Sequence, residues 1–241
     1  MHTLVKTFEE MIQDGSTLPQ GWDVRAVVND DNLTFLGMNS VTKEAIWVDP
    51  MKDDFEVLLS ESRKLEGYRF LAVIDTHTHA DHISCAADLA EAVGAPLVMH
   101  EGAPSRKIHL RVSRDVALPA VAAPLEILVT PGHTRDSITP VWGPFVFSGD
   151  TLIYGDTGRD DLPGGDPVSH YESLQKIKAR AKNEMILLPG HDAQARISSW
   201  KTQLAVSPSL SQPREVFVAE AGAYVGPSPK LLKESLFYNF Q

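Results

Sequence analysis

Seven histidine and aspartate side chains lie in turns that follow apolar runs, and these residue types bind metal ions. Residues 76–82 read Thr-His-Thr-His-Ala-Asp-His, so three of the nine histidines in this 241-residue chain lie within six positions. Three further turns, Pro-Gly-His-Thr, Ser-Gly-Asp-Thr and Pro-Gly-His-Asp, end other apolar runs. Together these turns supply His77, His79, Asp81, His82, His133, Asp150 and His191. Imidazole and carboxylate groups are ligands for iron and zinc.

The cysteine content narrows the kind of metal site. Structural zinc sites are usually closed and rich in cysteine, and this chain has one cysteine, Cys85. We therefore predict a metal centre with open coordination positions, and we expect Cys85 to be a small buried apolar side chain. The histidines outside such turns are expected to lie at the surface or in satisfied core positions; they are His2, His100, His109 and His170.

Strand ends are expected to hold these ligands. Apolar runs of strand type precede the four turns, over residues 71–75, 125–129, 144–149 and 185–189. Histidines two positions apart on an extended segment point the same way, so His77 and His79 can converge on one ion. A glycine precedes each of the last three ligands, which lets the backbone turn sharply and approach closely; these are Gly132, Gly149 and Gly190.

The remaining elements alternate between strands and helices. Three β-rich runs near the start predict an antiparallel meander over residues 23–30, 32–39 and 44–50. Apolar spacing and stop signals predict helices over residues 4–15, 54–67, 83–94, 168–181 and 195–206. Shorter strands are expected over 96–100 and 107–112, the latter within an irregular stretch from 101 to 124, and a proline-punctuated tail follows residue 210.

Composition bounds the class of protein. We expect a single domain over residues 1–241, with an N-terminal extension over 1–22 and a C-terminal tail over 211–241. The net charge of −10 offers no basic surface for nucleic acid. The apolar runs are shorter than the roughly 20 residues that span a bilayer, and no signal peptide is visible. One cysteine favours a reducing compartment, so we expect a cytoplasmic protein.

With these motifs together, the chain resembles the metallo-β-lactamase superfamily, whose signature is H-x-H-x-D-H. The resemblance covers about residues 23–210. It implies an α+β fold, an αβ/βα sandwich in which two mixed sheets face each other with helices outside. Within the superfamily the chain looks most similar to the persulfide dioxygenase branch, beside glyoxalase II. The turn Gly-Arg-Asp-Asp-Leu over residues 158–162 matches the G-R-T-D-F element of that branch.

The resemblance implies one Fe(II) per chain, held by His77, His133 and Asp150. Asp81, His82 and His191 would then support catalysis by orienting those ligands. The implied substrates are O₂ and a low-molecular-weight persulfide such as glutathione persulfide, which would give sulfite and a thiol. Arg159 would hold a substrate carboxylate, although an ion pair with Asp160 or Asp161 is the alternative interpretation. Weaker candidates for substrate contact are Tyr171, Arg196 and Arg214.

A dinuclear zinc hydrolase that acts on a thioester, lactone or phosphoester is the alternative. One zinc ion would take His77, His79 and His133, and the other would take Asp81, His82 and His191. Asp150 would lie between the two ions. A zinc-bound water with a pKa lowered to about 7 would be the nucleophile. All seven side chains are present, so the ligand set alone leaves both hypotheses open.

Departures from the branch pattern fall on the substrate side. Asp160 and Leu162 replace a threonine and a phenylalanine, and Ala193 replaces a tyrosine. Arg135 and Asp136 follow Pro-Gly-His-Thr, where the family has small or turn-forming residues, and Pro140 interrupts the next strand. For the wider surface, exposed residues 200–206 and the apolar tail 231–240 could form a homodimer contact.

Overall fold

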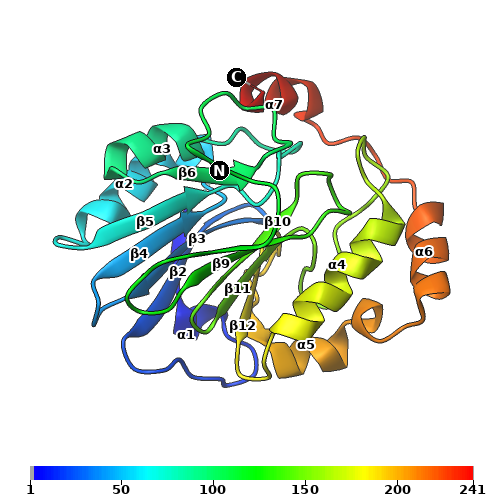
Figure 1. The fold of residues 1–241 in the computed structure, drawn as a ribbon, viewed down its shortest axis with the longest axis horizontal. Coiled ribbons are helices and arrows are strands. Elements are labelled where there is room, and N and C mark those ends of the chain that lie inside the picture. Colours follow the sequence, from blue (N-terminus) through cyan, green and yellow to red (C-terminus); the bar gives the residue numbers. More distant parts are fainter. Residues whose placement is uncertain (1–2, 241) are drawn as a thin grey trace.

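Two β-sheets packed face to face, with helices on both outer sides, form the protein in its computed structural model, which describes residues 3–240 (Figure 1). The first sheet has seven strands in chain order, antiparallel from β1 to β4 and parallel from β4 to β7. They are β1 (Leu4–Thr7), β2 (Trp22–Asn29), β3 (Asn32–Asn39), β4 (Glu44–Val48), β5 (Arg69–Ile74), β6 (Leu97–His100) and β7 (Leu110–Val112).

The second sheet has six strands in the order β13-β12-β11-β10-β9-β8. Only β11 and β12 pair in parallel there, because the chain crosses over between them through a helix. The strands are β8 (Val116–Leu118), β9 (Leu125–Val129), β10 (Ile138–Trp142), β11 (Phe145–Gly149), β12 (Ile186–Pro189) and β13 (Ser198–Ser199). Pro140 lies inside β10, opposite Ile127 of β9, so the strand continues through it.

Helices cover the outer face of each sheet (Figure 1). α2 (Phe55–Arg63) and α3 (Ala86–Val93) pack on the first sheet, and α4 (Pro167–Arg180), α5 (Trp200–Val206) and α6 (Arg214–Ala223) cover the second. The remaining helical elements are α1 (Phe8–Met11), α7 (Leu232–Asn239) and the 3-10 turns η1 (Lys52–Asp54) and η2 (Pro208–Leu210). Among residues 3–240, none of the helices has the length and hydropathy needed to cross a bilayer.

Alternation along the strands explains this layering. In β4, Ile46 and Val48 point into the core between the sheets, whereas Ala45 and Trp47 point toward α2 and α3. In β12, Ile186 and Leu188 face the first sheet and Leu187 faces the helices. Because successive side chains point to opposite faces, strands that are apolar on both faces are covered on both sides. The expected αβ/βα sandwich is confirmed.

Two terminal segments differ from the sequence expectations. The segment from Leu4 to Thr7 is strand β1, which pairs with β2, and only Phe8–Met11 is helical. The helix expected over residues 4–15 is therefore wrong at both ends, since Leu4–Thr7 extend the sheet edge and the helix stops at Met11. The proline-punctuated tail contains the helices α6 and α7. The division into one domain with terminal extensions stays a prediction.

Several single-residue expectations can be compared with the structure. Cys85 is buried, as expected, and burial raises the pKa of its thiol far above the usual value. Trp200 is also buried, so residues 200–206 are less exposed than expected for a dimer contact. His100 and His109 each accept a backbone hydrogen bond through Nδ1, as expected for histidines in local structural roles. His2 lies outside the described residues.

Candidate metal centre

The four predicted turns meet at one edge of the two sheets, around a cavity of about 1210 Å³. The histidine turn follows β5, His133 follows β9, Asp150 follows β11 directly, and His191 follows β12. Five of the seven predicted ligands line the cavity, namely His77, Asp81, His133, Asp150 and His191. His79 and His82 are buried beside them. The structure thus brings together all seven side chains that the sequence indicated.

His77, His133 and Asp150 form one group whose ligand atoms all lie within 4.8 Å of one another. His133 Nδ1 lies 2.7 Å from the Arg159 carbonyl oxygen, which can only accept, so Nδ1 carries the hydrogen. His77 Nδ1 lies 3.0 Å from the Thr76 hydroxyl, which donates its own hydrogen to a carboxylate. Both imidazoles therefore keep Nε2 as the atom with a free lone pair.

His79, Asp81 and His82 form a second group with the same spacing. His79 Nε2 lies 3.2 Å from Asp49, and His82 Nδ1 lies 3.0 Å from Asp81, so these nitrogens donate to carboxylates. The opposite nitrogens, His79 Nδ1 and His82 Nε2, are buried and have no hydrogen-bond partner within residues 3–240. Buried polar atoms are normally satisfied, so orphaned imidazole nitrogens beside carboxylates fit a metal-binding site.

His191 connects the two groups. Its Nδ1 lies 2.7 Å from Asp150 and its Nε2 lies 3.2 Å from Asp81. Burial by itself would lower the pKa of His191, but these two carboxylates raise it well above the ordinary value. Burial would likewise raise the pKa of Asp150, whereas His191, His133 and His77 bring it far below the usual range. Burial and the neighbouring His79 lower the pKa of His77 to about 3, so His77 is in the neutral form that binds metal.

Close backbone approach at the ligand turns explains two of the glycines. Gly149 has φ +49°, and a Cβ there would lie 2.3 Å from the Thr76 hydroxyl. A Cβ on Gly190 would lie 2.6 Å from an oxygen of Asp150. Since real Cβ contacts essentially never come below 3.0 Å, a larger residue at position 149 would displace Thr76, which adjoins His77, and one at position 190 would displace Asp150.

Asp49 and Asp136 hold the histidine turn, and sequence reasoning did not assign either of them. Asp49 accepts from the backbone N–H of Thr76 at 2.6 Å and from its hydroxyl at 2.8 Å. Asp136 accepts from the backbone N–H of Thr78 at 3.1 Å and also from its hydroxyl. Both carboxylates are buried. An aspartate at the end of the predicted strand 44–50, and another just after Pro-Gly-His-Thr, were the available signals.

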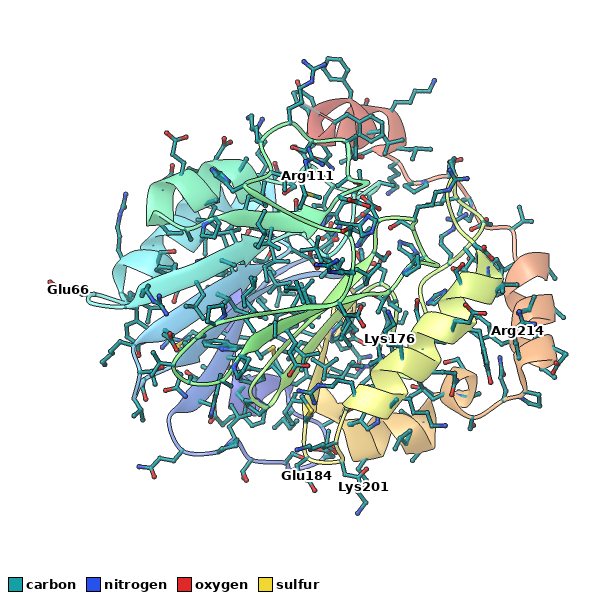
Figure 2. All side chains as sticks on the ribbon, in the orientation of Figure 1. Glu66, Arg111, Lys176, Glu184, Lys201 and Arg214 are labelled. Carbon is teal, nitrogen blue, oxygen red and sulfur yellow. The ribbon has the colours of Figure 1, made fainter. Side chains whose placement is uncertain are left out.

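The predicted substrate-side residues are placed unevenly. Arg159 lines the cavity, but its guanidinium is paired with Asp161 and donates to the Pro227 carbonyl. Tyr171 packs against the Phe217 ring at 5.8 Å and is not among the described residues that line the cavity. Arg196 is also absent from that lining. Its guanidinium pairs with Asp192 and lies over the Tyr154 ring. Arg214 projects from α6 on the outside of the molecule (Figure 2).

The structure shows the surroundings of two residues, Asp160 and Arg135, at which the chain departs from the branch pattern. Asp160 lies with Oδ1 2.6 Å from Nδ1 of the fully buried His170, whose Nε2 contacts the Thr151 carbonyl. The Asp160 carboxylate, which was expected beside a substrate anion, is thus hydrogen-bonded to His170. His170 itself is a core histidine with partners for both ring nitrogens. Arg135 is exposed, lines the cavity, and has no hydrogen-bond or ion-pair partner among the described residues. Its position after Pro-Gly-His-Thr was the signal that could have identified it.

Comparisons with known proteins agree with this fold and site. The family model described as Metallo-beta-lactamase superfamily matches residues 46–191. The chain is 32% identical over 207 residues to a hydroxyacylglutathione hydrolase of Anaeromyxobacter dehalogenans, covering 84% of this chain and 78% of that protein. It is 25% identical over 202 residues to the human protein "Persulfide dioxygenase ETHE1, mitochondrial", covering 82% of this chain and 78% of that protein.

A solved structure of ETHE1 from Myxococcus xanthus superimposes with a TM-score of 0.82 at 28% identity, covering 90% of this chain and 97% of that one. For some other curated relatives, the chain spans only 57% to 62% of their length. The chain therefore belongs to the metallo-beta-lactamase superfamily. It is an enzyme of that metal-dependent superfamily, with relatives among both persulfide dioxygenases and hydroxyacylglutathione hydrolases.

Proposed function

We propose that this protein is an iron-dependent persulfide dioxygenase. The reaction would combine a low-molecular-weight persulfide, R–S–SH, with O₂ and water to give sulfite, the thiol R–SH and two protons. The terminal sulfur is oxidised and O₂ is reduced, while the S–S bond breaks and its inner sulfur leaves as the thiol. We further propose that the protein acts in the cytoplasm.

The observation that carries the proposal is the geometry of His77, His133 and Asp150. These ligand atoms lie within 4.8 Å of one another, both histidines keep Nε2 free, and all three side chains face the cavity. Two histidines and one carboxylate on one face suit non-haem Fe(II) and leave positions for two more reactants. Bound there, Fe(II) would supply the redox chemistry by which O₂ reacts with sulfur.

The surrounding residues would position these ligands. The Arg159 carbonyl fixes the ring of His133, and His191 fixes Asp150 by contacting one of its oxygens at 2.7 Å. Asp81 in turn contacts His191 and His82. Such partners set ring orientation and basicity of metal ligands, so we assign Asp81, His82 and His191 to positioning in the mononuclear centre.

Arg135 replaces Arg159 as our candidate for holding a substrate anion. The guanidinium of Arg159 is already paired with Asp161, whereas Arg135, two residues after His133, lines the cavity and has no ion-pair partner among the described residues. Its planar guanidinium suits a bidentate contact with a carboxylate. We keep Arg159 as a wall of the cavity, and propose no substrate contact for Tyr171 or Arg196.

The relatives support this proposal but also favour one alternative. The human persulfide dioxygenase and the Myxococcus xanthus structure support the dioxygenase. The second group of His79, Asp81 and His82, together with the relative at 32% identity, favours a dinuclear zinc hydrolase of thioesters. In that case two zinc ions would be held, and zinc would activate a water nucleophile.

Two matched histidine variants separate these functions by metal content. For a mononuclear centre, His133→Ala should lose iron, whereas His82→Ala should keep about one iron per chain with activity reduced by about 10–100-fold. For a dinuclear hydrolase, His82→Ala should lose about one of two zinc ions together with thioester hydrolysis. Elemental analysis of both variants, beside O₂ uptake and thioester assays, decides between them.

A further inference from the structure

Helix α7 forms one side of the active-site cavity, although it is far from the metal-binding turns in sequence. Leu232, Leu236 and Phe240 line the cavity from this helix and the residue after it. Phe217 and Ala221 of α6 line the same cavity. In Figure 1, α7 lies at the top of the view, on the same side as α3 and β6, and apart from α6 at the right. The cavity therefore has a wall of apolar side chains supplied by the C-terminal segment.

This wall is hydrogen-bonded to the metal-binding turn itself. Asn239 donates from Nδ2 to the carbonyl oxygens of His79 and His82, each at 3.0 Å. Its Oδ1 accepts from the backbone N–H of Ser84 at 2.9 Å. The buried Ser235 hydroxyl lies 2.7 Å from the Ala80 carbonyl oxygen and also contacts the Leu231 carbonyl of its own segment, so its one hydrogen is shared between these two acceptors. One amide side chain thus uses both donors and its acceptor on the backbone that carries the histidines.

The segment that leads into α7 is held by the Arg159–Asp161 pair. Arg159 donates to the Pro227 carbonyl, and Asp161 accepts from the Gly226 N–H at 2.8 Å. The Arg159 guanidinium also lies over the Tyr224 ring, 5.7 Å from its centroid. Arg159, which the sequence suggested for substrate binding, therefore holds the segment that leads into the cavity wall.

The charges around the cavity do not suit glutathione. Among the described lining residues, the only arginines are Arg135 and Arg159, and none is a lysine. Arg159 is neutralised by Asp161, so one cation remains to meet an anion. Glutathione carries two carboxylates and one ammonium group. Asp31, Asp156 and Glu220 could pair with the ammonium group, but with Arg135 as the one arginine left, the second carboxylate has no arginine or lysine partner among the described lining residues. A single anionic group with an apolar body fits this lining better.

We propose that α7 is the specificity wall of the site, which selects substrates whose non-reacting part is apolar, and that Asn239 holds this wall against the metal-binding turn. The inference rests on the proposed function only in that the substrate is a persulfide. If the substrate were a thioester, the same wall would select its non-reacting part. Asn239 is a positioning residue, since it contacts the ligand-bearing backbone.

Binding of thiols to the metal-loaded protein tests the wall without requiring turnover. By calorimetry, propane-1-thiol, butane-1-thiol and hexane-1-thiol should bind with affinity that rises about threefold for each added methylene. Hexane-1-thiol should bind more tightly than glutathione. Leu236→Ala should flatten this dependence, whereas Phe237→Ala, at a neighbouring residue of α7 whose side chain is 64% exposed, should leave it unchanged.

Asn239→Asp tests the attachment of the wall. The change keeps an acceptor for the Ser84 N–H but replaces the NH₂ group, which supplies both donors, with one charged oxygen that faces the carbonyls of His79 and His82. We expect the dependence on chain length to be lost and the metal affinity to fall by about tenfold or more.

Two results would overturn the inference: glutathione binding more tightly than hexane-1-thiol, or equal behaviour of Leu236→Ala and Phe237→Ala. A retained chain-length dependence without O₂ uptake would instead support the wall and reject only the dioxygenase proposal.

Discussion

At the scale of single residues, buried aspartates keep the histidine turn in a ligand-ready geometry. Asp49 accepts from the N–H and hydroxyl of Thr76 and contacts His79 Nε2. This carboxylate therefore orients His79 directly and His77 through the Thr76 hydroxyl. In Asp49→Asn one oxygen becomes a donor that faces other donors. We expect metal affinity to fall by about 10–100-fold, as measured by competition with a chelator. Asp53→Asn, an exposed change in η1, is the control, and equal affinities of the two variants would contradict this role.

The exposed cation at the cavity is a second single-residue feature. If Arg135 holds a substrate anion, Arg135→Ala should raise KM by about tenfold with little change in kcat, because the contact forms in ground and transition states alike. Arg214→Ala, which removes an arginine outside the cavity, should leave both constants unchanged. A fall in kcat alone for Arg135→Ala would argue against substrate anchoring. Steady-state kinetics with carboxylated and uncharged persulfides would make the comparison.

The convergence of the seven candidate ligands could be predicted because each lies in a turn that follows an apolar strand, which is a local signal. Asp49 could not be assigned, because it lies 27 positions before Thr76 and meets it only when β4 and β5 pair. Arg159 was visible as a candidate, but its pairing with Asp161 and Pro227 depends on a segment 68 residues away. Local patterns thus indicate which candidate ligands come together better than they indicate the partners of a side chain such as Arg159.

At the scale of elements, the strand ends position the ligands only if the turns stay tight. Gly149→Ala would combine a left-handed backbone with a contact to Thr76, so we expect a loss of about 3 kcal/mol in the free energy of unfolding. Gly67 also has positive φ, +79°, but a Cβ there meets nothing within 4 Å. Gly67→Ala should therefore cost only about 1 kcal/mol. Urea unfolding of both variants measures this difference, and equal losses would show that close packing at Gly149 is unimportant.

Alternating and two-sided apolar runs were sufficient to predict β2 to β7, β9, β11, β12 and the helices α2 to α5, apart from their ends. They missed β1 and β13, which lie in predicted helices, and β8, which lies in a stretch expected to be irregular. The first helix was misread because "LVKTFEEM" has helical spacing, while Leu4 to Thr7 gain backbone hydrogen bonds from β2. The α7 helix was not predicted, because its stabilising contacts, Ser235 with Ala80 and Asn239 with His79, span 155 and 160 positions. Tertiary contacts override local propensity in such segments.

At the scale of the whole molecule, Glu44 joins the two sheets. Its buried carboxylate lies in β4 and accepts from Arg69 of β5 and from the N–H groups of Val121 and Ala122, which lead into β9. Burial by itself would raise the pKa of Glu44, but these hydrogen bonds outweigh it and lower the pKa below its usual value. The carboxylate therefore stabilises the folded state above the unfolded pKa of about 4.3, and this contribution is lost as pH falls through the lower folded pKa.

Glu44→Gln should accordingly lower the free energy of unfolding by about 2 kcal/mol at pH 7, and the difference from the wild type should shrink as the pH falls below about 4. Glu66→Gln is the control, because Glu66 is exposed in the loop between α2 and β5, at the left of the view in Figure 2. Urea titrations of both variants and the wild type, from pH 7 to below pH 4, measure these free energies of unfolding. A constant difference at every pH would mean that packing, rather than charge, explains the effect.

The central claim concerns the chemistry at His77, His133 and Asp150, and the most direct test is oxygen consumption by iron-loaded protein supplied with hexyl and glutathione persulfides. An oxygen electrode and a sulfite assay would follow the same reaction. The proposed function predicts persulfide-dependent O₂ uptake with sulfite formed in equal amount, and its loss in His133→Ala. Iron-loaded protein that takes up no O₂, while zinc-loaded protein hydrolyses thioesters, would contradict the dioxygenase and assign the protein to the hydrolases.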